Sequence, residues 1–130
     1  MQKTNNLPDV ELASIYEKLL AMYSEAEFLD KALIVADHNE ALLKQMECKG
    51  YTEELRMSNI TPLQYKTFVI SKTIIAYLNH AVALARMEKQ DDAQKYLSMA
   101  EELAAKHPDI AASESGIMQR IALFKKNGLP

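Results

Sequence analysis

Apolar residues recur every three or four positions along most of the chain, which is the spacing of amphipathic helices. Between residues 9 and 49 the pattern runs without a glycine or a proline, so it fits one long helix or two shorter ones. Globular helices rarely run to about 40 residues, and Ser24 followed by Glu27 has the form of a capping box. We therefore favour two helices, and we expect Gly50 to cap the end of the second.

The clearest helix start lies at Thr61. Its hydroxyl can accept from an unpaired backbone N–H, Pro62 suits the first helical position, and Gln64 can complete a capping box. Ile60 and Tyr65 have the spacing of a hydrophobic staple across this cap. These signals agree on a helix that begins at residue 61 or 62.

The helix predicted for residues 62–89 carries large apolar side chains around most of its circumference between residues 68 and 85. A helix that is apolar nearly all round is buried on most of its sides. We therefore expect this segment to be the central helix of the core. The polar residues 50–60 before it are expected to be a connection.

Two shorter helices are predicted after the central one. The first covers about 92–106, with Asp91 as its cap and Pro108 just beyond its end. The second covers about 110–126, or starts near residue 115.

Together these elements predict an all-α fold of about five antiparallel helices in a hairpin-stacked bundle. The chain has 130 residues, of which 48% are hydrophobic and 25% are charged, which is ordinary for a globular protein. We expect a single helical domain over residues 1–130, with residues 1–7 as a frayed tail.

The string YLNHAVALARMEKQDDAQKYLSMAEELAAKHPD places small residues where two helices of a hairpin would touch, with Ala81 on the first helix and Ala93 on the second. Residues 74–108 therefore resemble a tetratricopeptide-type repeat, in which a proline such as Pro108 follows the second helix. Glu88 departs from the pattern, because glycine is frequent at that turn in the family. The resemblance implies a module that grips a peptide or helix of another protein on a concave face.

The net charge is −3, and no segment carries a dense basic face, so we expect no binding to nucleic acid. Cys48 is the single cysteine, which rules out an intrachain disulfide and fits a reducing compartment. The N-terminal residues lack a secretory signal, and no apolar run approaches the roughly 20 residues that span a bilayer. We expect a cytoplasmic protein without a membrane partner.

Catalytic and metal-binding patterns are absent from the sequence. The three histidines, His38, His80 and His107, have no second ligand at helical spacing, so we expect no metal and no cofactor. Cys48 has no adjacent histidine or second cysteine, and no phosphate-binding loop or nucleophile elbow occurs. We therefore expect that the protein is not an enzyme.

Contact surfaces are the remaining candidates, because tyrosine is favoured where proteins meet. The leading hypothesis is a binding module, an adaptor, chaperone or regulator that holds a protein or peptide segment. One alternative is a sensor of a small ligand with a pocket between helices near His80 and Tyr65, and another is a structural homodimer. The candidate binding residues are Tyr23, Tyr65, Tyr77, His80 and Leu84.

Overall fold

The computed structural model describes residues 9–113 and 116–127, and this part of the chain is helical with no strand. The predicted all-α class is therefore confirmed. The predicted tail, residues 1–7, lies outside the described residues. The described helices are α1 (Asp9–Glu25), α2 (Leu29–Lys49), α3 (Glu53–Met57), α4 (Pro62–Arg86), α5 (Gln90–Lys106), α6 (Pro108–Ser113) and α7 (Ile117–Asn127).

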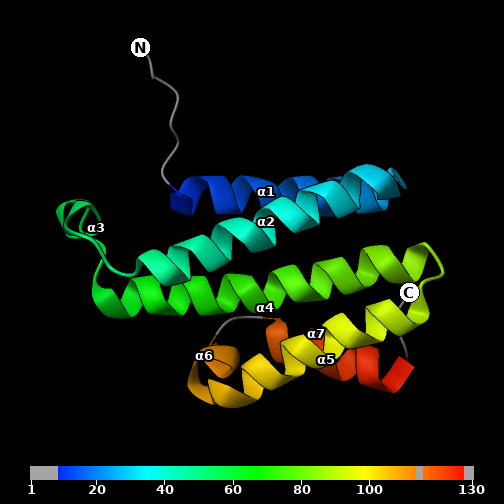
Figure 1. The fold of residues 1–130 in the computed structure, drawn as a ribbon. Coiled ribbons are helices and arrows are strands. Elements are labelled where there is room, and N and C mark those ends of the chain that lie inside the picture. Colours follow the sequence, from blue (N-terminus) through cyan, green and yellow to red (C-terminus); the bar gives the residue numbers. More distant parts are fainter. Residues whose placement is uncertain (1–8, 114–115, 128–130) are drawn as a thin grey trace, which may run out of the picture.

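The helix α4 runs through the middle of the molecule (Figure 1). The α1–α2 hairpin covers one side of it, and α5, α6 and α7 cover the other. Both α2 and α5 run antiparallel to α4 (Figure 1): a three-residue turn joins α4 to α5, and residues 50–61, which contain α3, join α2 to α4. The bundle is therefore a stack of helical hairpins that share α4.

The predicted break in residues 9–49 is confirmed, but its predicted cause is wrong. Ser24 is buried within α1, and α2 begins after Phe28 without a side-chain cap. Glu27, the other half of the predicted capping box, instead adopts the left-handed backbone conformation with φ 64°. The backbone carbonyl of Ser24 accepts a hydrogen bond from the guanidinium of Arg86 on α4, so a distant residue satisfies this helix end.

The predicted start of α4 is confirmed in detail. The Thr61 hydroxyl accepts from the Gln64 backbone N–H at 3.1 Å, and the Gln64 side-chain oxygen accepts from the Thr61 N–H at 2.9 Å. Pro62 occupies the first helical turn. Ile60 and Tyr65 belong to the same apolar cluster, as a hydrophobic staple requires. The start of the central helix is thus fixed by its local sequence.

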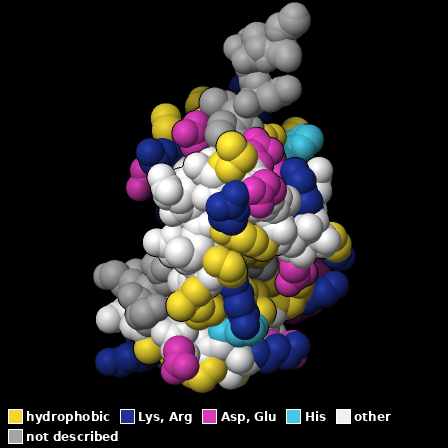
Figure 2. Space-filling view, turned by 90° about the vertical axis from the view of Figure 1, so that its left-hand side faces the viewer, with side chains coloured by type: hydrophobic (Ala, Val, Ile, Leu, Met, Phe, Trp, Pro, Cys, Tyr) yellow, Lys and Arg dark blue, Asp and Glu magenta, His cyan; other side chains and the backbone are white. Residues whose placement is uncertain are grey.

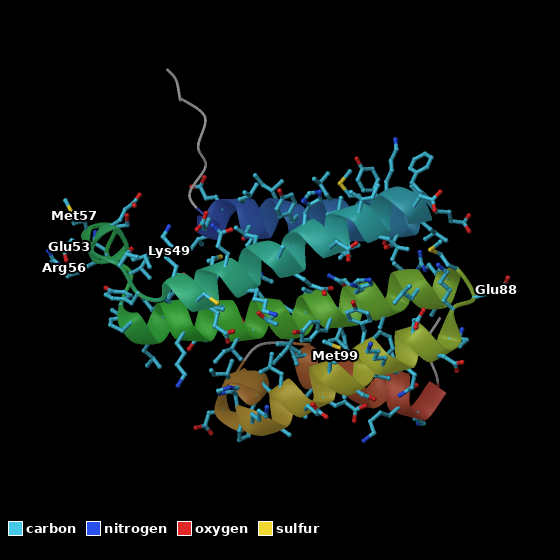
Figure 3. All side chains as sticks on the ribbon, in the orientation of Figure 1. Lys49, Glu53, Arg56, Met57, Glu88 and Met99 are labelled. Carbon is cyan, nitrogen blue, oxygen red and sulfur yellow. The ribbon has the colours of Figure 1, made fainter. Side chains whose placement is uncertain are left out.

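The connection predicted for residues 50–60 contains the short helix α3, which the sequence analysis missed. Gly50 ends α2 with φ 72°, as predicted, and Thr52 then caps α3 by accepting from the Leu55 N–H at 3.2 Å. Figure 3 shows α3 at one end of the bundle, with Arg56 and Met57 pointing away from the core. This helix is therefore a surface element.

Two predicted boundaries after α4 are corrected. The helix ends at Arg86 rather than residue 89, because Glu88 has φ 63° and turns the chain. The next helix begins at Gln90 without a side-chain cap, and Asp91 lies inside its first turn instead of capping it. A turn with a left-handed residue therefore replaces the predicted capped connection.

The last predicted helix, about 110–126, is two helices in the structure, and the second agrees with the alternative start near residue 115. Pro108 opens α6, and Gly116, with φ 92°, precedes α7. Ile117 and Ile121 are buried against the core and Phe124 packs beside them. The chain therefore turns once more and still brings the apolar face of its last helix inward.

The core lies on opposite sides of α4, which confirms its central place. On one side Ile74 and Leu78 pack with residues of α5, α6 and α7, and on the other Tyr65 and Val69 pack with α1 and α2. Of the large apolar side chains described on α4, only Leu63 is exposed. Burial of each large side chain stabilises the fold by roughly 1.5–3 kcal/mol before the loss of entropy is counted.

Of the part of the chain that the structure describes, only α4 is long and apolar enough to cross a membrane by length and composition. On that measure the expectation that no segment could span a bilayer is wrong. However, 61% of the most apolar window of α4 is buried inside the protein, as in the core helix of a soluble protein. The feature is therefore weak evidence for a membrane span.

Candidate functional site

A groove of about 700 Å³ runs along α4, with α2 and α5 as its walls. Its floor is largely apolar and is formed by Leu43 of α2, Val69 and Ile70 of α4, and Leu103 of α5. Met99 lies on the side of α5 that faces α4 (Figure 3). Seen from the end of the bundle that carries α3, hydrophobic side chains form a band down the middle of the face, with charged side chains beside it (Figure 2).

One end of the groove lies at the start of α4, where Tyr51, Lys66 and His107 line it. The Tyr51 hydroxyl donates to the backbone carbonyl of Ile60, and its ring packs edge-on against Tyr65 with the centroids 6.4 Å apart. These contacts hold the connection before α4 against the groove. This end therefore combines aromatic rings with a lysine and a histidine side chain.

Tyr65 fixes the α2 wall to the floor. Its ring is buried, and its hydroxyl donates to the backbone carbonyl of Met46 at 2.9 Å. Burial raises the pKa of the Tyr65 hydroxyl above its usual value, and Asp9 adds to the shift. The hydroxyl therefore stays protonated, which keeps this hydrogen bond near neutral pH.

The other end of the groove lies above a cluster centred on His80. The imidazole Nδ1 pairs with the carboxylate of Glu40 on α2, and the ring stacks on Tyr96 of α5 with the centroids 3.9 Å apart. An ionised carboxylate can only accept, so Nδ1 carries the proton of this hydrogen bond. His80 is 5% exposed and lies beneath the groove, while Glu40 reaches its lining. One buried side chain thus ties α2, α4 and α5 together.

Burial and nearby carboxylates act on two tyrosine hydroxyls at this end of the groove. Burial raises the pKa of Tyr77, and the carboxylates of Glu40 and Glu47 raise it further. Burial is also the largest cause that raises the pKa of Tyr96. Charge repulsion raises it further, and the groups responsible are Glu40, Asp37, Tyr77 and Asp92. Both phenols therefore stay neutral near physiological pH and can donate or accept hydrogen bonds.

The structure brings together three of the five predicted binding residues. Tyr65 and Tyr77 line the groove, and His80 holds Glu40 at its edge. Leu84 is buried in a separate apolar cluster with Ala85 and Ala93. Tyr23 of α1 packs against Phe28, the residue before α2, and neither ring lines the groove.

The sequence analysis missed the groove residues Glu40, Leu103 and Lys66. Glu40, Lys44 and Glu47 do follow one another at i, i+4 and i+7, which places them on one face of α2. That signal marks a polar face of the helix. It does not show that the face borders a groove.

Within the described ranges, no group of three or more His, Cys, Asp or Glu side chains is arranged to hold a metal ion. Comparisons with family models, with curated proteins and with solved structures returned no match for this chain. The resemblance of residues 74–108 to a tetratricopeptide repeat therefore stays a prediction.

Proposed function

We propose that this protein is a non-enzymatic binding module that holds a segment of a partner protein in the groove between α2, α4 and α5. The observation that carries the proposal is the groove itself, with an apolar floor and charged side chains along its walls. Ligand sites combine these two features, since the apolar surface supplies affinity and the polar groups fix orientation.

The shape of the groove favours a chain segment over a compact ligand. Its lining on α4 extends from Pro62 to Tyr77. At the helical rise of about 1.5 Å per residue, these residues span roughly 22 Å. An extended peptide of about six or seven residues covers that length at about 3.3 Å per residue. The same groove presents Leu43, Val69 and Leu103 in turn to such a segment.

The walls are held in place without a ligand. The Tyr65 hydroxyl bonds α4 to the carbonyl of Met46 on α2, and His80 joins Glu40 of α2 to Tyr96 of α5. A site that is already ordered loses less conformational entropy on binding. The groove is therefore suited to bind a flexible segment, which itself has to be ordered.

The test uses a random peptide library displayed on phage and panned against the purified chain. Selected peptides should bind the Ala41→Trp variant at least about tenfold more weakly than the wild type, because the new indole projects from the α2 wall into the groove. The matched control is Ile34→Trp, since Ile34 is exposed on the same helix but does not line the groove. A library that yields no binder, or binders equally tolerant of both variants, contradicts the proposal.

A small-ligand sensor is the second candidate, and the groove volume of about 700 Å³ favours it, because ligand pockets typically measure about 300–1,000 Å³. A thermal-shift screen of metabolites separates the two candidates. A metabolite that raises the melting temperature of the wild-type chain but not of Ala41→Trp supports the sensor. The homodimer stays a prediction, and light scattering that finds a strict monomer would eliminate it.

A further inference from the structure

The groove is built almost entirely from the sides of helices. All of its lining residues belong to α2, α4 or α5, except Gly50, Tyr51 and His107 at one end. In the middle of a helix the backbone N–H and C=O groups bond to one another along the axis. At the end of the groove, the Gly50 N–H donates to a carbonyl of α2 at 3.0 Å and the His107 N–H to a carbonyl of α5 at 3.2 Å. The described walls therefore do not present a row of free backbone groups with which an extended segment could pair.

Three polar side chains that line the groove are also bonded within the protein. The Thr73 hydroxyl donates to a backbone carbonyl of its own helix at 2.6 Å, and the Tyr65 hydroxyl donates to a carbonyl of α2 at 2.9 Å. The carboxylate of Glu40 pairs with His80. An extended segment on the apolar floor would thus find few partners for its backbone, and a buried N–H or C=O without a partner is costly. A helix avoids this cost, because it bonds its own backbone groups.

The length and position of the groove suit a helix as well. The lining residues of α4 from Pro62 to Tyr77 span roughly 22 Å, which a helix of about 15 residues, or about four turns, covers. Such a helix would lie on α4 between α2 and α5. One apolar face could then contact Leu43 of α2, Val69 of α4 and Leu103 of α5 together.

The charged side chains of the groove walls carry both signs. Lys44 and Glu47 lie on α2, and Lys66 lies on α4. None of the three has an ion-pair partner in the part of the chain that the structure describes. They can pair with charged residues on the two flanks of an amphipathic helix, and as a set they select neither an acidic nor a basic one.

We propose, on the basis of the proposed function, that the partner segment binds in the groove as an amphipathic helix of about four turns. Its apolar residues recur at i, i+3, i+4 and i+7 and face the floor, and charged residues of both signs stand on its flanks. A free helix of about 15 residues is only marginally stable in water, so the segment becomes ordered when it binds.

The first test is an alanine and proline scan of a synthetic peptide that binds the wild-type chain. The peptide comes from a phage library of random segments about 20 residues long, enough for a helix that covers the groove. Alanine should weaken binding at i, i+3, i+4 and i+7. Proline at a central position where alanine has no effect should weaken binding at least about tenfold, because it breaks the helix without removing a contact.

The second test reads the backbone of the bound peptide directly. The ¹³C chemical shifts of its labelled Cα atoms should move to helical values on binding. A lactam bridge between solvent-facing lysine and aspartate side chains at i and i+4 should strengthen binding about fivefold, because less conformational entropy is lost. The matched control is the same peptide without the bridge.

The outcomes separate this inference from the proposed function. Peptides whose binding is weakened by Ala41→Trp, but which tolerate the central proline or keep extended Cα shifts, overturn the inference and leave the proposed function standing. Alanine effects that alternate along the peptide also overturn it, because they are the pattern of an extended segment. A library with no binder contradicts the proposed function and the inference together.

Discussion

The first half of α4 (residues 62–79) and its shorter second half (residues 80–86) both lie between α2 and α5, but they carry different side chains. In the second half, Ala81, Ala83 and Ala85 are buried. Ala83 packs with Ala32 and Ala36 of α2, and Ala85 packs with Ala93 of α5. Small side chains let helix axes approach closely, so this half of α4 is closed.

The first half of α4 carries large side chains instead. Tyr65, Val69, Ile70 and Tyr77 follow one another along the groove, whose lining on α4 ends at Tyr77. Larger side chains at a helix contact hold the axes farther apart. The comparison teaches that the groove lies along the part of α4 with large side chains and ends where buried alanines begin.

Leu33 and His80 mark where the halves meet. Leu33 of α2 packs against both alanine clusters, which joins the walls over the closed half. His80 contacts Glu40 on one wall and Tyr96 on the other, immediately before the groove opens. The end of the groove is therefore held by contacts of one α4 residue with both walls.

The largest expected effect tests whether Leu84 belongs to the closed half or to a binding surface. Leu84→Ala should lower the free energy of unfolding by about 2–5 kcal/mol, because it leaves a cavity in a buried cluster. Leu103→Ala should cost clearly less, since Leu103 is only partly buried and already borders the groove. Urea denaturation gives both values. Equal losses would mean that the two halves are packed alike.

Enlarging alanines tests the spacing directly. Ala83→Leu should destabilise the fold by about 1–3 kcal/mol, because the extra volume forces α1, α2 and α4 apart. Ala41→Leu adds the same atoms to an exposed residue of the groove wall and should change stability by no more than about 0.5 kcal/mol. Thermal or urea unfolding of the two variants measures the contrast. A neutral Ala83→Leu would contradict the close approach of helices in the closed half.

The sequence predicts the elements of this comparison better than their arrangement. The start of α4 at Thr61 is readable because every group of its cap lies within a few residues. The Ser24 cap was predicted wrongly, because Ser24 still belongs to α1, whose end is closed by the backbone of Glu27 and Phe28 and by a hydrogen bond from Arg86, far along the chain. The apolar character of α4 indicated a core helix, and it is one.

One alternative placed a pocket between helices near His80 and Tyr65, but the walls of the groove could not be predicted, for the same physical reason. Tyr65 and Tyr77 were singled out as tyrosines, without a signal that they lie on one open face. Glu40 was passed over because its role depends on the rotation of α2 about its own axis, which places it beside His80. Only tertiary packing determines that rotation.

Removing the contact between Glu40 and His80, which lies where the two halves of α4 meet, should have a smaller effect on the free energy of unfolding. Glu40→Ala leaves the buried Nδ1 of His80 without its partner and should cost about 1 kcal/mol, the lower part of the usual range, because water can enter from the groove. Glu47→Ala removes a carboxylate about two turns farther along α2 and should stay within about 0.5 kcal/mol of the wild type. Chemical denaturation at neutral pH compares them. A Glu40→Ala variant as stable as Glu47→Ala would show that the boundary is not held by this contact.

The smallest expected effect is a loss of stability at alkaline pH that originates at the same boundary. The pKa values of Tyr77 and Tyr96 are raised in the folded protein, chiefly by burial and then by Glu40. Between the unfolded pKa of about 10 and the higher folded values, the unfolded chain binds fewer protons than the folded one, so stability falls as pH rises. Below about pH 9 the contribution of these groups is fully present.

The double variant Tyr77→Phe/Tyr96→Phe cannot release these protons and should therefore show a shallower fall in stability between about pH 9.5 and 11 than the wild type. Lysine deprotonation contributes to both proteins alike, so the difference between the two slopes isolates the tyrosines. Urea denaturation at a series of pH values measures it. If the two proteins lose stability with pH at the same rate, the hydroxyls of Tyr77 and Tyr96 are as well solvated in the folded protein as in the unfolded chain. Water then reaches these hydroxyls more freely than the packing of His80 on Tyr96 indicates.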